Sequence, residues 1–160
     1  MAKVLHAAEM TQFSNLVFDL EKDHQELSNL VASFRDAVVS SDRSAAREAL
    51  NKIDDVATGH FRFERGYLYP RMRRLVFELI ERLHSEQDAV KRFIKESSDI
   101  LNKERLGKDT ATSILNMLPA LSKYLKDCNE LIMLADKFGK EEKSDLNQKL
   151  KECSKRRVTK

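Results

Sequence analysis

The chain has 160 residues, of which 41% are hydrophobic and 34% are charged, and it contains only four glycines and two prolines. This length suits one domain with a hydrophobic core, and the scarcity of turn-forming residues favours long helices over a β-rich fold. The 29 basic and 26 acidic residues leave a net charge of +3, which is too small and too dispersed to indicate a nucleic-acid-binding protein. We therefore expect a single all-α domain over residues 1–160, with its core at about residues 12–138.

The sequence lacks the features that direct a chain to a membrane or to an oxidising compartment. The first residues are too polar for a signal-peptide core, and no apolar run approaches the length of a transmembrane helix. Cys128 and Cys153 form neither a CxxC motif nor a disulfide framework. These observations predict a cytoplasmic protein with no membrane partner.

Apolar residues recur at intervals of three and four along the first part of the chain and predict two helices. The first covers residues 13–38 and carries His24 on its apolar face. After a short polar break that supplies an N-cap, the second covers residues 46–64. Two polar residues, His60 and Glu64, interrupt its apolar face one turn apart.

The second part of the chain shows the same periodicity. A third helix is expected from about residue 75 to residue 103, with Gln87 as the polar residue on its apolar face. A fourth is expected over residues 114–135, and Pro119 either begins this helix or kinks it. A short last helix is expected at residues 144–153.

Four amphipathic helices with short connections bury their apolar faces most simply as an antiparallel up-and-down four-helix bundle, here with a short extra C-terminal helix. The connection at residues 70–75 contains no Gly, Asn or Asp to form a turn. A continuous helix that exchanges halves between two chains is therefore an open alternative, and the protein is expected to be a monomer or a dimer.

The polar residues on the apolar faces indicate a buried site. His60 and Glu64 point to the same side of their helix, and titratable groups are rarely buried unless they are paired or bind a metal. His24 and Gln87 also lie near the middle of their helices, so the four side chains should form one layer. Layers of imidazoles and carboxylates hold iron or manganese in helical bundles. The alternative is a core without metal, in which Lys123 replaces the positive charge of the metal and pairs with Glu64 or Asp127.

Two segments resemble the motifs of a known protein family. The segment LEKDHQEL, at residues 20–27, resembles the first-helix histidine motif of the hemerythrin-like, or HHE cation-binding, domains. The segment GHFRFERGYLYP, at residues 59–70, resembles their second-helix motif, including the closing aromatic residue and proline. The resemblance runs from about Phe18 to Leu150 and implies a hemerythrin-like bundle. It also implies that His24 and His60 are terminal iron ligands and that Glu64 is a bridging carboxylate.

The second half of the chain departs from the family pattern. Gln87 stands where the third helix of the family has a histidine, and the His-x-x-x-Glu pattern of the fourth helix is absent. Aligning the apolar faces places Tyr124 and Cys128 at those two positions. Aligning the downstream Leu-Ala-Asp-Lys segment places Lys123 and Asp127 there instead.

Three matched residues, His24, His60 and Glu64, could still hold one metal ion as a two-histidine, one-carboxylate set. Candidates to complete the ligand set are His84, Gln87, Tyr124, Asp127 and Cys128. The expected cofactor is non-haem iron, mononuclear or di-iron, and a degenerate site would hold none.

The first functional hypothesis is a non-enzymatic iron-binding protein that binds or senses dioxygen, nitric oxide or iron. The second is a metal-free bundle that acts as a regulatory module by binding a protein partner. A di-iron oxidase or peroxidase has the least support, because that chemistry needs more carboxylates than this core supplies. The sequence also contains no glycine-rich phosphate loop, HExxH motif or nucleophile elbow.

Overall fold

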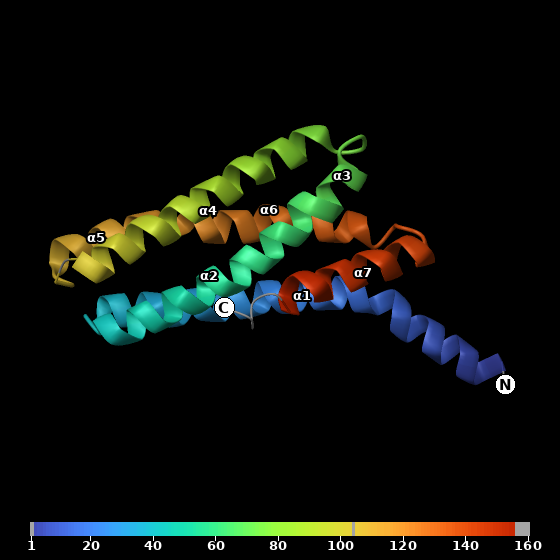
Figure 1. The fold of residues 1–160 in the computed structure, drawn as a ribbon, viewed down its shortest axis with the longest axis horizontal. Coiled ribbons are helices and arrows are strands. Elements are labelled where there is room, and N and C mark those ends of the chain that lie inside the picture. Colours follow the sequence, from blue (N-terminus) through green and yellow to red (C-terminus); the bar gives the residue numbers. More distant parts are fainter. Residues whose placement is uncertain (1, 104, 156–160) are drawn as a thin grey trace.

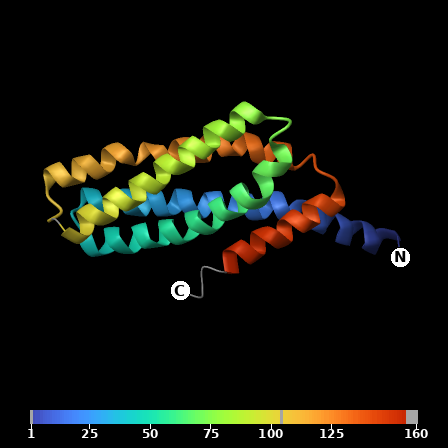
Figure 2. The ribbon, with the colours of Figure 1, turned by 45° about the horizontal axis from the view of Figure 1, so that its top comes forward.

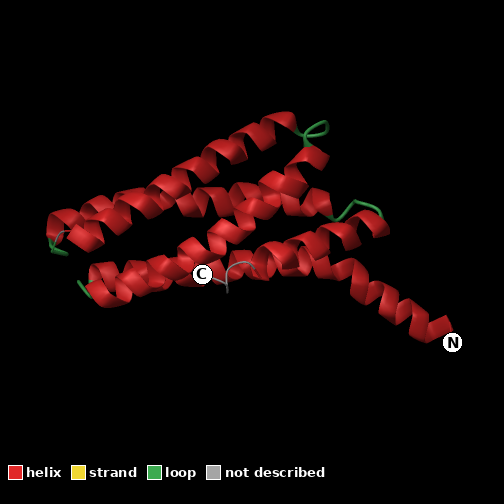
Figure 3. Cartoon of the chain, in the orientation of Figure 1, coloured by secondary structure: helices red, strands yellow, loops and turns green. Residues whose placement is uncertain are grey.

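The structure is a computed structural model that describes residues 2–103 and 105–155, with side chains described from residue 16 onward. Helices account for most of the described chain, and no strand occurs within it (Figure 3). The expected all-α class is therefore confirmed. Phe13, the expected start of the first helix pattern, lies outside the described side chains.

The first two helices form a hairpin. Helix α1 (Ala2–Val39) and helix α2 (Arg43–Phe63) lie side by side, and the first turns of α1 extend beyond the rest of the bundle (Figure 1). The tight turn between them places Ser41 in the left-handed region, with φ 59°. Asp42 then caps α2, because its side chain accepts a hydrogen bond from the backbone N–H of Ala45 at 3.0 Å. The polar break predicted from the sequence thus provides the N-cap.

The chain does not leave α2 as a regular helix. A π-helical turn, η1 (Glu64–Leu68), follows α2 directly and leads into the short helix α3 (Tyr69–Met72). Pro70 gives a physical reason, since proline has no N–H to donate and its ring clashes with the carbonyl group four residues earlier in an α-helix. In this wider turn, the backbone N–H of Tyr69 donates a hydrogen bond to the carbonyl of Glu64, five residues earlier.

The chain then reverses direction within residues 73–76. The N–H groups of Leu75 and Val76 both bond the carbonyl of Met72, at 2.9 and 3.1 Å, and helix α4 (Phe77–Lys103) begins immediately afterwards. The alternative of a continuous helix through residues 70–75 is wrong for this chain. Because the turn needs no positive φ at these positions, it forms without the Gly, Asn or Asp that the sequence lacks.

The predicted fourth helix is divided into two. Helix α5 (Lys108–Met117) ends just before helix α6 (Pro119–Ala135), so Pro119 begins a new helix instead of kinking a continuous one. Proline suits a first helical position because its missing N–H would have no intrahelical partner there. Helix α6 packs mainly along α4 and also contacts α1 (Figure 1).

Helix α7 (Lys140–Lys155) is longer than the predicted last helix and packs against α1 and α2 (Figure 2). It adds Leu146, Leu150 and Cys153 to the hydrophobic core, to which all the other helices also contribute buried side chains. Asn147 also bonds the carboxylate of Asp19 on α1 at 2.9 Å. In the described part of the chain, no helix is both long enough and apolar enough to cross a membrane.

Candidate metal centre

Four buried side chains from four elements of the fold converge in the middle of the bundle. His24 lies on α1, His60 on α2, Glu64 at the start of η1 and Cys128 on α6. One possible ligand atom from each lies within 4.8 Å of the others. His60, Glu64 and Cys128 are 0% exposed and His24 is 6% exposed, so solvent hardly reaches the cluster.

The two histidines direct their Nε2 atoms at each other across 3.1 Å. The opposite nitrogen of each ring is held from outside the cluster: Nδ1 of His24 donates to Oδ1 of Asn129 at 3.1 Å, and Nδ1 of His60 donates to Oδ2 of Asp23 at 3.0 Å. With Nδ1 protonated, a neutral imidazole has a bare lone pair on Nε2. Two such lone pairs repel each other at this distance unless a cation lies between them or beside them. That cation can be a proton or a metal ion.

The carboxylate of Glu64 completes this arrangement with its Oε1 atom. Oε1 lies 3.2 Å from Nε2 of His60 and 2.8 Å from Sγ of Cys128, which donates to it. A cation bound by the two Nε2 atoms would therefore have a negatively charged oxygen and a sulfur atom at the same point. Imidazole nitrogen, carboxylate oxygen and cysteine sulfur are all common ligands of transition metals.

The other oxygen of Glu64, Oε2, faces hydrogen-bond donors of the protein itself. The hydroxyl groups of Tyr69 and Tyr124 donate to it at 2.9 and 2.6 Å, and Nε2 of Gln87 donates at 2.5 Å. Gln87 also donates to the Tyr69 hydroxyl at 2.7 Å. Because these donors surround Oε2, the carboxylate presents only Oε1 to a metal.

The charges of the centre follow from these contacts. Burial opposes the charged forms of His60 and Glu64, but their mutual attraction outweighs it. The attraction of Glu64 and hydrogen bonds to Asp23 and Glu64 raise the pKa of His60 to about 9. The charge and hydrogen bond of His60, with bonds from Cys128 and Tyr124, lower the pKa of Glu64 to about 2. Without metal, the proton between the two rings therefore belongs to His60.

The neighbouring groups stay neutral. Burial, and next the positive charge of His60, lower the pKa of His24 to about 4. Burial raises the pKa of the Tyr124 hydroxyl and of the Cys128 thiol, and the nearby Glu64 carboxylate raises both further. In the metal-free protein, His24 is thus a neutral acceptor and Cys128 is a thiol that donates.

The π-helical turn explains how Tyr69 reaches this centre. Five residues along a regular α-helix correspond to a rotation of about 500°, which would point Tyr69 about 140° away from Glu64. The wider turn of η1 brings the two side chains onto one face, where they bond directly. The Tyr69 hydroxyl is therefore part of the centre. Single π-helical turns occur often at functional sites.

Arg65 supports the centre from the surface side. Its Nε atom donates to Oε1 of Gln87 at 2.5 Å. One terminal nitrogen, Nη2, donates to both the backbone carbonyl of His84 and the carboxylate of Asp88, at 3.0 and 2.7 Å. Although Arg65 lies off the apolar face of its helix, it fixes the orientation of the Gln87 amide. This orientation turns the Gln87 nitrogen toward Glu64.

The structure decides between the two alignments of the fourth helix. Tyr124 and Cys128 face the centre, whereas Lys123 and Asp127 lie at its outer edge, 3.3 Å apart. Lys123 also pairs with Glu86 on α4. The interpretation that Lys123 pairs with Glu64 is therefore wrong, and its pairing with Asp127 is confirmed.

The remaining candidate, His84, lies outside the cluster. Its ring packs edge-on against the ring of Tyr69, with centroids 5.0 Å apart, and it is partly exposed. Gln87 reaches Glu64 but contributes an amide nitrogen, which is a donor and not a metal ligand in this orientation. The described contacts thus join Gln87 to the centre and leave His84 beside it.

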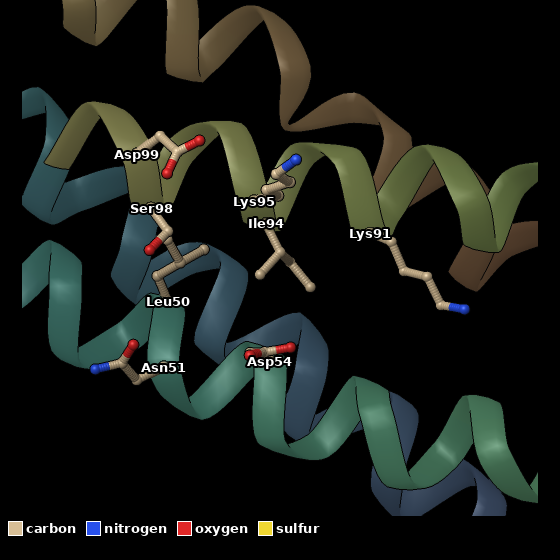
Figure 4. Close-up of a pocket in the computed structure, with 8 residues that line it drawn as sticks. All are labelled: Leu50, Asn51, Asp54, Lys91, Ile94, Lys95, Ser98 and Asp99. Carbon is tan, nitrogen blue, oxygen red and sulfur yellow. The ribbon is translucent and has the colours of Figure 1, made fainter. Parts of the chain in front are cut away.

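A separate groove opens on the surface between α2 and α4. It has a volume of about 320 Å³, and its walls carry charges of both signs, including Asp54 and Asp99 as well as Lys91 and Lys95 (Figure 4). The side chains come from α2 on one side and from α4 on the other. This solvent-facing groove contains none of the residues of the buried cluster.

The sequence of the chain matches the model of one protein family. The model of the hemerythrin HHE cation-binding domain matches residues 15–143, which cover most of the chain. The chain belongs to this family. Comparisons with curated proteins and with solved structures find no match. The predicted resemblance is thus confirmed by the family match, and cation binding is the property by which the family is described.

The centre of this HHE domain fits a metal ion by its donor chemistry. The bare Nε2 atoms of His24 and His60 converge beside Oε1 of Glu64. Asp23 and Asn129 accept hydrogen bonds from the Nδ1 atoms of the two rings. Carboxylate and carbonyl groups commonly hold metal-bound histidines in this way. His24, His60, Glu64 and Cys128 could therefore hold one ion.

Several residues that support the centre could not be identified from the sequence. Asp23 directly precedes His24, and Asn129 directly follows Cys128. Neither lies in a sequence pattern that predicts its contact with a histidine on another helix. Tyr69 is displaced by the π-helical turn, for which Pro70 is the only signal we find. Arg65 is separated from Gln87 by 22 positions, so their contact depends on the turn between α3 and α4.

Proposed function

We propose that this HHE domain binds one divalent transition-metal ion in its core through His24, His60 and Glu64. The observation that carries the proposal is the pair of Nε2 atoms that face each other at 3.1 Å beside the Glu64 carboxylate, with both Nδ1 atoms already bonded elsewhere. This arrangement leaves the lone pairs of two imidazoles for a shared cation. In the metal-free protein a proton on His60 takes that role, so the metal and the proton compete for one place.

A single ion is favoured over a di-iron centre. A bridging carboxylate needs both of its oxygens, but Oε2 of Glu64 is occupied by Tyr69, Tyr124 and Gln87. A second ion would have to displace all of these donors. Glu64 is accordingly a terminal ligand through Oε1 in this proposal.

Iron is the ion that the family resemblance implies. With iron bound by three protein ligands, a fourth position would be available to dioxygen or nitric oxide, and the protein would store or sense iron or a gas. The proposal also includes an antiparallel up-and-down arrangement of the four main helices, a cytoplasmic location and a role without catalysis. A monomeric or dimeric state and a protein partner stay predictions from the sequence.

Metal analysis of the purified protein tests this proposal. We expect about one ion per chain after reconstitution with ferrous or zinc ion, and a higher melting temperature with metal, because the ion binds the folded state. His60→Gln should lose most of the bound metal, whereas His84→Gln, which changes a histidine outside the cluster, should retain it. A protein that binds no metal and whose melting temperature ignores both ions would refute the proposal.

A second candidate is a metal-free regulatory module. It is favoured by the complete hydrogen bonding of Glu64, whose two oxygens both meet donors without any metal. In that case His60 and Glu64 would form a buried ion pair, and the function would depend on the protein surface. Absence of metal binding in the experiment above would favour this candidate.

A further inference from the structure

We propose that Cys128 is the fourth ligand of the centre, as a thiolate, and that the site consequently prefers a tetrahedral ion of the zinc or cobalt(II) class to iron. This inference rests on the proposed function and deepens it by naming the ion. It also changes the expected role, because the position that dioxygen or nitric oxide would use on iron is filled by a protein side chain.

The position of the sulfur atom is the first argument. Cys128 is fully buried, and its Sγ lies 2.8 Å from Oε1 of Glu64, the same oxygen that lies 3.2 Å from Nε2 of His60. All four ligand atoms fall within 4.8 Å of one another. Ligand atoms of a tetrahedral zinc ion, with bonds of about 2.0–2.3 Å, lie about 3.3–3.8 Å apart. Small side-chain movements therefore suffice to place all four around one ion.

The number of ligands is the second argument. Because the donors of Tyr69, Tyr124 and Gln87 hold Oε2, Glu64 supplies one oxygen and not two. Two nitrogens, one oxygen and one sulfur then make a four-coordinate set. Closed four-coordinate sites with nitrogen and sulfur ligands are typical of zinc, whereas non-haem iron sites with two histidines and one carboxylate keep open positions.

The charge of the site is the third argument. Two neutral imidazoles, one carboxylate and one thiolate carry two negative charges, which balance one divalent ion. The groups around Oε2 are a pair of hydroxyls and an amide, so they add no charge. The ion and its four ligands are thus neutral together, which suits a fully buried position, where uncompensated charge is costly. The Asp23 carboxylate behind His60 is not a ligand and is partly exposed. As the ion binds, the Cys128 thiol proton and the Nε2 proton of His60 are released to solvent.

Cobalt(II) is the probe that tests the inference, because its spectrum reports both the geometry and the presence of a sulfur ligand. With one equivalent of cobalt(II), we expect intense visible bands of a tetrahedral ion and a near-ultraviolet charge-transfer band from thiolate. Zinc should displace the cobalt stoichiometrically, whereas ferrous ion under anaerobic conditions should not.

Two matched cysteine variants show which sulfur atom binds the metal. Cys128→Ser should abolish the charge-transfer band and weaken cobalt(II) binding at least about tenfold. Cys153→Ser, which changes the other buried cysteine, on α7, should leave band and affinity unchanged. Even if Cys128→Ser fails to fold, the charge-transfer band of the wild-type protein shows whether a thiolate binds the ion.

The two proposals fail differently. Cobalt(II) that binds with the weak bands of a six-coordinate ion and no charge-transfer band would overturn the role of Cys128 and leave the proposed metal site standing. The same holds if ferrous ion outcompetes zinc. Cobalt(II) that does not bind at all would overturn both.

Discussion

Glu64 is the residue on which the centre depends. Among the described side chains, those of His60 and Cys128 contact its Oε1 atom, and those of Tyr69, Tyr124 and Gln87 contact its Oε2 atom. Hydrogen bonds to a buried carboxylate are stronger than those between neutral groups. These contacts allow an ionised carboxylate to remain in an otherwise apolar core, and they divide its oxygens into one for a cation and one for the protein.

Tyr124→Phe tests this division. The substitution removes the 2.6 Å bond to Oε2 but retains the ring, which packs edge-on against Phe61 with centroids 5.0 Å apart. We expect the free energy of unfolding of the metal-free protein to fall by about 1–3 kcal/mol, measured by urea denaturation. Tyr67→Phe, in a half-buried position of η1, should change it by less than about 0.5 kcal/mol. Equal stability of Tyr124→Phe and the wild type would show that the hydroxyl does not support Glu64.

At the scale of the elements, η1 and α4 are held together by Arg65. Its guanidinium group bonds Gln87, Asp88 and the backbone of His84, and Gln87 in turn bonds Glu64. The surface of α4 is thus connected to the buried carboxylate through two side chains. The π-helical turn makes this possible, because it changes the directions of the side chains that follow Glu64.

Arg65→Gln should weaken this connection. A glutamine is shorter and cannot bond three acceptors at once, so the buried oxygen of Gln87 would lose its partner. We predict a decrease of about 1–2 kcal/mol in the free energy of unfolding. Arg62→Gln, which changes an exposed arginine three positions earlier, serves as the control and should be nearly neutral. Similar losses in both variants would assign the effect to surface charge and not to the contact with Gln87.

At the scale of the whole molecule, the buried centre couples folding to pH. The pKa of His60 is raised from 6.5 to about 9, so its contribution to stability is fully present below pH 6.5 and is lost as the pH rises through 9. The pKa of His24 is lowered from 6.5 to about 4, so the unfolded chain binds a proton that the folded protein excludes, and stability falls as the pH drops from 6.5 toward 4. The pKa of Glu64, lowered from 4.5 to about 2, adds a further loss below pH 4.5.

The metal-free protein should therefore be most stable near pH 6.5, where the effects of His60 and His24 meet. A shift of this size corresponds to a loss of about 3 kcal/mol between pH 6.5 and pH 9. Urea denaturation of chelator-treated protein across this range measures the profile. His60→Gln should remove most of the alkaline decline, and an unchanged decline in that variant would assign it to other groups.

The sequence alone determined the helical class, the family and the first three residues of the centre. These follow from local rules: the spacing of apolar residues predicts each helix, and one turn of helix brings His60 and Glu64 to the same face. His24 was recognised because it is a polar residue on an apolar face. The family match covers residues 15–143 and so includes these three residues.

The tertiary structure alone decided what surrounds Glu64. The choice of Tyr124 and Cys128 over Lys123 and Asp127 depends on the rotation of α6, which begins anew at Pro119. The approach of Tyr69 depends on a local π-helical turn that periodicity does not reveal. Contacts between distant helices are fixed by how their faces pack together, and a sequence pattern records only which residues each helix offers.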